Sequence, residues 1–179
     1  MQYFIGIPLP DDIKEKIVSF QESFANNKVH LMVEPHITVK AQGGLIEDKF
    51  WIPAIENAIK EYPAFEVSFA DVGNFGERVA FLVPSSGKEL MGLHRILVNV
   101  IKPSAELMEK YFEGDNYHFH LTLAGTSWGM TSEELMLVKE KAKIELLNLQ
   151  KFRVSFIRVY EQKDHDGPYE KLLDIPLKK

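Results

Sequence analysis

The sequence predicts an α+β fold made of two similar lobes, each an antiparallel-rich sheet with helices outside it. The 179 residues suit a single globular domain. Segments with the two-residue period of strands alternate with segments of helical period. The segment 65–69 (Phe-Glu-Val-Ser-Phe) is echoed by 152–156 (Phe-Arg-Val-Ser-Phe), which indicates an internal repeat. We therefore expect one bilobal domain over residues 1–179, with pseudo-twofold-related lobes and a cleft between them.

The first half of the chain has the order strand, helix, strand, helix, strand. Pro8 and Pro10 end the first strand, and a turn at 74–77 precedes the first strand of the next half. The strands expected here span residues 2–7, 35–40 and 65–69, and the strand after the turn spans residues 79–83. The apolar stripes that predict the two helices are Ile13, Ile17, Phe20 and Phe24, and then Trp51, Ile55, Ala58 and Tyr62.

The second half repeats this order. Thr131 and Glu134 have the spacing of a capping box and predict the start of its second helix. A turn over 163–167 separates the last two strands. The strands expected here span residues 117–123, 152–160 and 169–175. The helical stripes are Leu90, Leu93, Leu97 and Ile101, and then Leu135, Val138, Ala142 and Leu146.

A four-residue motif occurs once in each half, at equivalent places in the repeat. It reads His36-Ile37-Thr38-Val39 in the first half and His120-Leu121-Thr122-Leu123 in the second. The chain has only four threonines, so two in matching positions are informative. Residues i and i+2 of a strand share a face, so each His lies beside its Thr while the alternate residues face the core. A pseudo-twofold fold would bring all four polar groups into one cleft.

These four side chains suit phosphodiester chemistry. Two imidazoles with ordinary pKa values of about 6.5 can serve as one acid and one base near neutral pH. Two hydroxyls can donate hydrogen bonds to phosphate oxygens. The set needs no metal ion, so we predict a metal-independent site with no cofactor, in which His36 and His120 are catalytic and Thr38 and Thr122 bind phosphate.

The doubled motif resembles that of the 2H phosphoesterase superfamily, in particular its bacterial 2′-5′ RNA ligase and cyclic phosphodiesterase (LigT-like) branch. The resemblance covers about residues 2–176 and includes the opening Phe-Ile-Gly-Ile-Pro-Leu-Pro at 4–10. Pro35 precedes the first motif, as is usual in this superfamily. Phe119 stands before the second motif, where a proline is usual.

The resemblance implies an enzyme that acts on a 2′,3′-cyclic phosphate or a 2′-5′-linked RNA end. It assigns His120 as the base and His36 as the acid, although the sequence symmetry alone leaves this order open. The reverse reaction would make the protein a 2′-5′ RNA ligase. Two further alternatives are a metal-dependent phosphodiesterase and a binding module that holds an RNA end or nucleotide without turnover.

Other polar residues near the motifs have two interpretations each. Lys40 continues the face of His36 and Thr38, where it either attracts phosphate or is simply exposed. His118 precedes His120 by two residues and either lines the cleft or lies exposed at the start of the strand. His118, His120 and His36 could together form a metal site. The aromatic residues that could stack a base are Tyr117, Phe119 and Trp128.

Composition narrows the class of protein further. The absence of cysteine excludes disulfides, thiolate nucleophiles and Cys-based zinc or iron–sulfur sites. A net charge of −5 disfavours a wide footprint on duplex DNA. No apolar run is long enough for a membrane span, and the first ten residues lack the basic region of a signal peptide. We expect a cytoplasmic protein with a small nucleotide or RNA-end substrate; its oligomeric state stays open.

Overall fold

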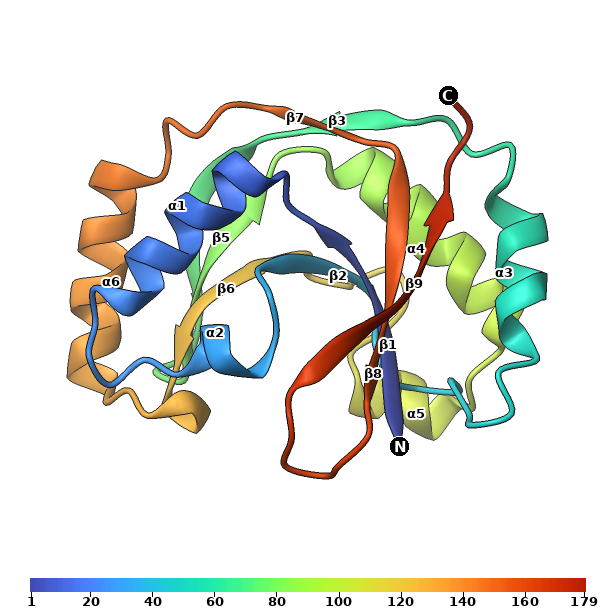
Figure 1. Ribbon diagram of the computed structural model, residues 1–179, viewed down its shortest axis with the longest axis horizontal. Coiled ribbons are helices and arrows are strands. Elements are labelled where there is room, and N and C mark those ends of the chain that lie inside the picture. The colour runs from blue at the N-terminus through green and yellow to red at the C-terminus, as the bar shows by residue number, and fades with distance from the viewer.

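The computed structural model describes all residues, 1–179, and combines helices with antiparallel sheets (Figure 1). The α+β prediction is confirmed. The strands are β1 (Gln2–Pro8), β2 (His36–Lys40), β3 (Phe65–Val67), β4 (Phe69–Phe75), β5 (Val79–Pro84), β6 (Leu121–Gly125), β7 (Phe152–Val154), β8 (Phe156–Gln162) and β9 (Tyr169–Pro176). The helices are α1 (Asp11–Glu22), α2 (Val29–Met32), α3 (Trp51–Ile59), α4 (Gly87–Ile101), α5 (Ala105–Lys110) and α6 (Ser132–Glu145), with a 3₁₀ turn at Thr126–Trp128.

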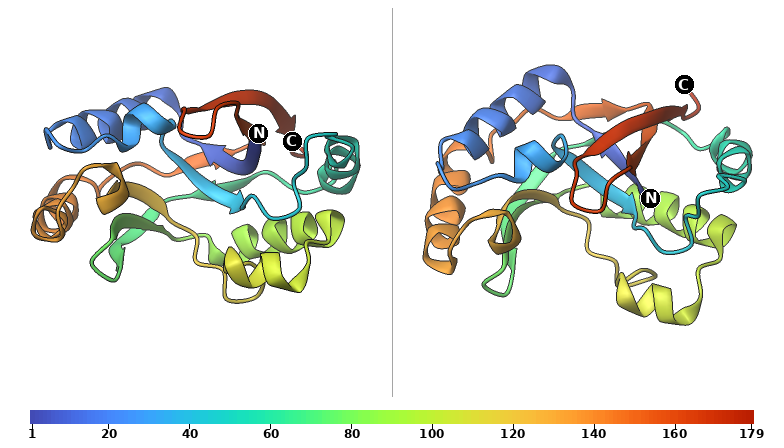
Figure 2. Two further views of the ribbon diagram at one scale, coloured as in Figure 1. Left: turned by 90° about the horizontal axis from the view of Figure 1, so that it is seen from below. Right: turned by 60° about the horizontal axis from the view of Figure 1, so that its bottom comes forward.

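The strands form two main sheets and one short ribbon. One sheet has the order β2-β1-β8-β9 and the other the order β4-β5-β6, and every ladder in them is antiparallel. The ribbon consists of β3 and β7, which run along one side of the molecule (Figure 1). The further views in Figure 2 show helices outside both sheets, with α3 beside α4 at one end and α1 beside α6 at the other. No helix is both long enough and apolar enough to cross a membrane.

The two echoed segments of the repeat pair with each other. In the β3–β7 ribbon Glu66 lies opposite Arg153, at the centre of an antiparallel register. From this ribbon each segment enters a main sheet: β4 pairs with β5, and β8 pairs with β1. The sheet that contains β1 and β2 thus takes β8 from the second half of the repeat pattern. The sheet that contains β5 and β6 takes β4 from the first half. Strand β9 is added only to the sheet that contains β1.

The core lies behind the motif strands. Ile37, Val39, Leu121 and Leu123 are completely buried, as the two-residue period predicts. Their burial turns the alternate residues of both motifs toward the gap between the sheets. The capping box at the start of α6 is also confirmed, because the Thr131 and Glu134 side chains each accept a hydrogen bond from the other's backbone N–H.

Some element boundaries differ from the predictions. The strand predicted over 117–123 begins only at Leu121, so His120 lies immediately before β6. The strands predicted at 65–69 and 152–160 are each interrupted, at Ser68 and at Ser155, where the chain passes from the ribbon into a main sheet. The helices α2 and α5 were not predicted, because they are too short to show a helical period.

Candidate active site

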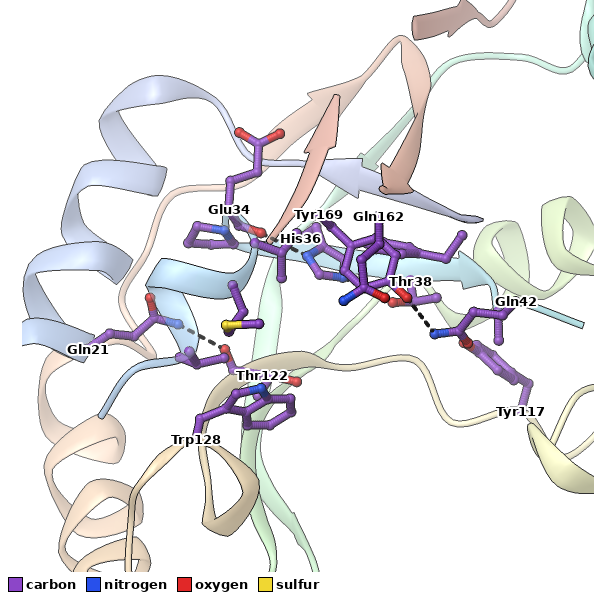
Figure 3. A pocket seen from close by; sticks show the side chains of 16 residues that line it. Gln21, Glu34, His36, Thr38, Gln42, Tyr117, Thr122, Trp128, Gln162 and Tyr169 are labelled. Carbon is purple, nitrogen blue, oxygen red and sulfur yellow. Dashed lines mark hydrogen bonds between the residues drawn. The ribbon is translucent and has the colours of Figure 1, made fainter. Parts of the chain in front are cut away.

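The two motif strands are edge strands of different sheets. β2 is the outer strand of its sheet and β6 the outer strand of the other, and they contact each other without forming a ladder. A cavity of about 350 Å³ opens beside this contact. His36, Thr38 and Thr122 all line it (Figure 3). The contact between β2 and β6 therefore brings three of the four predicted side chains into one cavity wall.

A β-bulge follows the threonine in both motifs. In the β1–β2 ladder Gly6 lies opposite Thr38 and Ile5 opposite Lys40, so Val39 is the extra residue. In the β5–β6 ladder Leu123 is the extra residue in the same way. Bulges bend a strand and redirect side chains near active sites. The two halves thus share a local backbone irregularity as well as a residue pattern.

Buried side chains cap the carbonyl groups of these bulges. The Val39 carbonyl accepts a hydrogen bond of 2.9 Å from Nδ1 of His94, on α4. The Leu123 carbonyl accepts one of 2.9 Å from Nδ2 of Asn27. His94 also accepts a bond of 3.0 Å from the Gly114 N–H through Nε2, so its neutral tautomer carries the proton on Nδ1. Burial lowers the pKa of His94, which keeps it in this form.

The hydrogen bonds of His36 define its tautomer. Its Nδ1 lies 2.8 Å from the Glu34 carbonyl, which can only accept, so Nδ1 carries the proton. Nε2 is then the basic nitrogen, and it lies 3.2 Å from Oγ1 of Thr38. The ring packs against Phe4 and Tyr160. Burial lowers the pKa of His36 to about 4, and the charge of a protonated His120 contributes to this lowering.

His120 repeats this arrangement in the second motif. Its Nδ1 donates to the carbonyl of His118 at 2.7 Å, again two residues earlier, and its Nε2 is left as the basic nitrogen. The ring packs edge-on against Phe75, with a centroid distance of 4.9 Å, and against Phe81. Burial lowers the pKa of His120 as well. Unlike His36, His120 is not part of the cavity wall.

Lys40 departs from both interpretations of the sequence. Its side chain is fully buried, outside the cavity, and its Nζ forms an ion pair of 2.8 Å with Glu113. The Nζ also donates to the carbonyls of Ala41 and Gly43. The physical reason is the Val39 bulge, which breaks the two-residue alternation and turns Lys40 away from the face of His36 and Thr38.

The remaining candidates divide between the cavity and the surface. His118 is exposed and lies outside the cavity, so only its backbone carbonyl contributes, by holding His120. Of the aromatic candidates, Tyr117 and Trp128 line the cavity, whereas Phe119 does not. The His, Asp and Glu side chains form no group of three with the geometry of a metal site, and this includes His36, His118 and His120.

Sequence reasoning missed part of the cavity wall. Gln42 follows β2, and Gln162 and Tyr169 face each other at the ends of β8 and β9. Gln21 on α1 donates to the Thr122 carbonyl at 3.1 Å (Figure 3). Glutamine has no motif of its own, so only the positions flanking the predicted turn at 163–167 could have pointed to Gln162 and Tyr169.

Two matched His-x-Thr motifs lie at edge strands of different sheets, which is the arrangement that the resemblance to the 2H phosphoesterase superfamily implies. The family model of the 2′-5′ RNA ligase superfamily matches residues 9–166, and the chain belongs to that superfamily. No match was found among curated protein sequences.

Several crystal structures share the fold over nearly the whole length of both chains. Each of three examples covers 99% of this chain and 98% of its own. They are the TT0787 protein of Thermus thermophilus, with 16% identity and a TM-score of 0.70, a protein described as a phosphoesterase, with 18% and 0.64, and E. coli LigT complexed with NADP⁺, with 19% and 0.63. E. coli LigT has also been crystallised with phosphate, 3′-AMP and ATP.

Proposed function

We propose that the protein is a metal-independent phosphoesterase that hydrolyses a 2′,3′-cyclic phosphate or a 2′-5′-linked nucleotide through His36 and His120. The observation that carries the proposal is the placement of His36, Thr38 and Thr122 in one cavity wall, with His120 two residues before Thr122 in the chain. Superfamily membership and the nucleotide complexes of E. coli LigT support the substrate class.

In the proposed reaction one neutral imidazole accepts a proton from water through Nε2. The water oxygen forms a bond to phosphorus, and the bond between phosphorus and the leaving ribose oxygen breaks. The second imidazole, protonated at Nε2, gives its proton to that oxygen. Both rings are suited to this use of Nε2, because each Nδ1–H is already held by a backbone carbonyl. The hydroxyls of Thr38 and Thr122 would bind the other phosphate oxygens.

One of the two imidazoles must be protonated when the substrate is bound. Burial keeps both pKa values low in the free protein, which favours two neutral rings near pH 7. A bound phosphate is negatively charged, and an opposite charge within about 4–6 Å favours the protonated form of a histidine. Substrate binding would therefore supply the charge that lets one imidazole become the acid.

Two indications about the roles point in opposite directions. The resemblance to the superfamily assigns His120 as base and His36 as acid. The lowered pKa of His36, about 4, favours a neutral ring there and hence the base. A substrate with a very good leaving group needs little help from an acid, so it restores turnover to the variant that lacks the acid. Rescue of His36→Ala supports the assignment from the superfamily, and rescue of His120→Ala supports the assignment from burial.

The test is incubation with adenosine 2′,3′-cyclic phosphate in the presence of EDTA, with product analysis by chromatography. We expect hydrolysis by the unaltered protein and a large loss of activity in His36→Ala and His120→Ala. The control variant His165→Ala, which changes an exposed histidine on the turn between β8 and β9, should keep full activity. Binding without turnover would identify the non-catalytic binding module instead. In a parallel incubation with RNA in place of the nucleotide, joining of RNA ends would identify the ligase.

A further inference from the structure

The cavity has an uncharged polar wall on one side of the motif residues. Figure 3 shows Trp128 and Thr122 on one side of His36 and Thr38, and Gln42 on the other. We call Gln42, Gln162 and Tyr169 the amide wall. Gln162 and Tyr169 come from the β8–β9 hairpin, and β9 has no counterpart in the sheet that contains β6. This wall therefore breaks the symmetry of the two motifs.

Hydrogen bonds inside the protein fix the polar groups of the amide wall. Nε2 of Gln42 donates to the Tyr169 hydroxyl at 3.3 Å, and that hydroxyl donates to Oε1 of Gln2 at 3.0 Å. Nε2 of Gln162 donates to the Gly167 carbonyl at 2.8 Å. Each glutamine thus keeps Oε1 as an acceptor and one Nε2–H as a donor without a partner in the protein, and the Tyr169 proton is already engaged.

No lysine or arginine side chain is available to this cavity. None of its lining residues is Lys or Arg. Two cations in the sheet that contains the first motif both have anionic partners. Lys40 is buried against Glu113. Arg158, on β8, binds Asp174 through two nitrogens and Glu34 through a third. The cavity wall therefore offers His36, Thr38 and Thr122 as groups for a phosphate, and the amide wall offers only uncharged hydrogen-bonding groups.

We propose that the amide wall binds an uncharged hydroxyl-bearing part of the nucleotide, so that the substrate carries a single phosphate, at the two histidines. This inference rests on the proposed function and narrows its substrate class. A ribose hydroxyl has a proton to donate to Oε1 of Gln42 or Gln162. A terminal phosphate at neutral pH has a charge of nearly −2, and the amide wall has no lysine or arginine to offset the loss of its hydration.

Calorimetric binding of two ligands tests this without requiring turnover. Adenosine 3′-monophosphate and adenosine 3′,5′-bisphosphate differ only in the second phosphate. We expect the bisphosphate to bind about tenfold more weakly, a factor within the range for a charged group that lacks a partner. Equal or tighter binding of the bisphosphate would overturn the inference, and so would failure of the monophosphate to bind.

A pair of substitutions at Gln42 locates the effect. Gln42→Lys places a cation on the wall and should raise bisphosphate affinity about tenfold relative to the monophosphate. Gln42→Met has a similar size and no charge, and it should leave the monophosphate preferred. No relative gain in Gln42→Lys would overturn the placement of the wall. Hydrolysis of adenosine 2′,3′-cyclic phosphate by the same preparation tests the proposed function separately. If no hydrolysis occurs, the preference between the two ligands can still be measured by calorimetry.

Discussion

Replacing Lys40 by Met should lower the free energy of unfolding by about 3–5 kcal/mol, the usual cost of removing one partner of a buried ion pair. The side chains of Lys40 and Glu113 are both completely inaccessible to solvent. Without the ammonium group the Glu113 carboxylate stays buried with the Ala41 N–H as its remaining hydrogen-bond donor. The carbonyls of Ala41 and Gly43 also lose a donor.

Urea unfolding followed by far-ultraviolet circular dichroism measures this loss. With a slope of about 2 kcal/mol per molar urea, the midpoint should fall by roughly 2 M. Lys151→Met is the matched control, because Lys151 pairs with Glu66 at the same distance of 2.8 Å but is 66% exposed. It should cost less than about 1 kcal/mol.

A second variant separates the buried charge from the lost packing. Adding Glu113→Gln to Lys40→Met removes the stranded charge and keeps an acceptor for the Ala41 N–H, so part of the stability should return. A loss below about 1 kcal/mol in Lys40→Met alone would refute the reasoning, since it would mean that Glu113 does not depend on the ion pair.

The remaining predictions concern the motifs. His36→Ala and His120→Ala should each lower kcat by about 10²–10⁴-fold, and the double variant should lose less than the product of the two, as steady-state kinetics can measure. Thr38→Val or Thr122→Val should lower kcat/KM by roughly ten- to a hundredfold through loss of a hydrogen bond to a charged group, and an unchanged value would remove that threonine from the site. The rate should be bell-shaped in pH, with limbs that belong to the coupled histidine pair. Unfolded His36 binds a proton below about pH 6.5 and the folded form only below about 4, so stability should fall as the pH drops between these values. Urea midpoints at pH 7 and pH 5 should therefore differ less in His36→Gln than in the unaltered protein.

The two-residue period of the motifs predicted correctly which residues face the core. It could not predict the bulges, because these depend on contacts from distant parts of the chain. The Val39 carbonyl is capped by His94 and the Leu123 carbonyl by Asn27, neither of which is near its bulge in the sequence. The error for Lys40 follows directly, since one extra residue reverses the face of every residue after it.

The amide wall was beyond sequence reasoning for a related reason. Strand β8 pairs with β1, and β9 with β8, so Gln162 and Tyr169 reach the cavity only after the last strands join the first. Their residue types are neutral and carry no motif. The turn between them at 163–167 could be predicted. That its flanking residues line the cavity became apparent only once β8 and β9 were placed beside β1.

The exchange of strands between the halves has a consequence for folding during synthesis. β1 is made before its partner β8, which lies about 150 residues later in the chain. At about 5–20 residues per second, β1 waits roughly 8–30 s on the ribosome with one edge unpaired. Contacts so distant in sequence also slow folding in general. Until β8 emerges, the nascent chain exposes an apolar edge strand, which is the kind of surface that aggregates or is bound by chaperones.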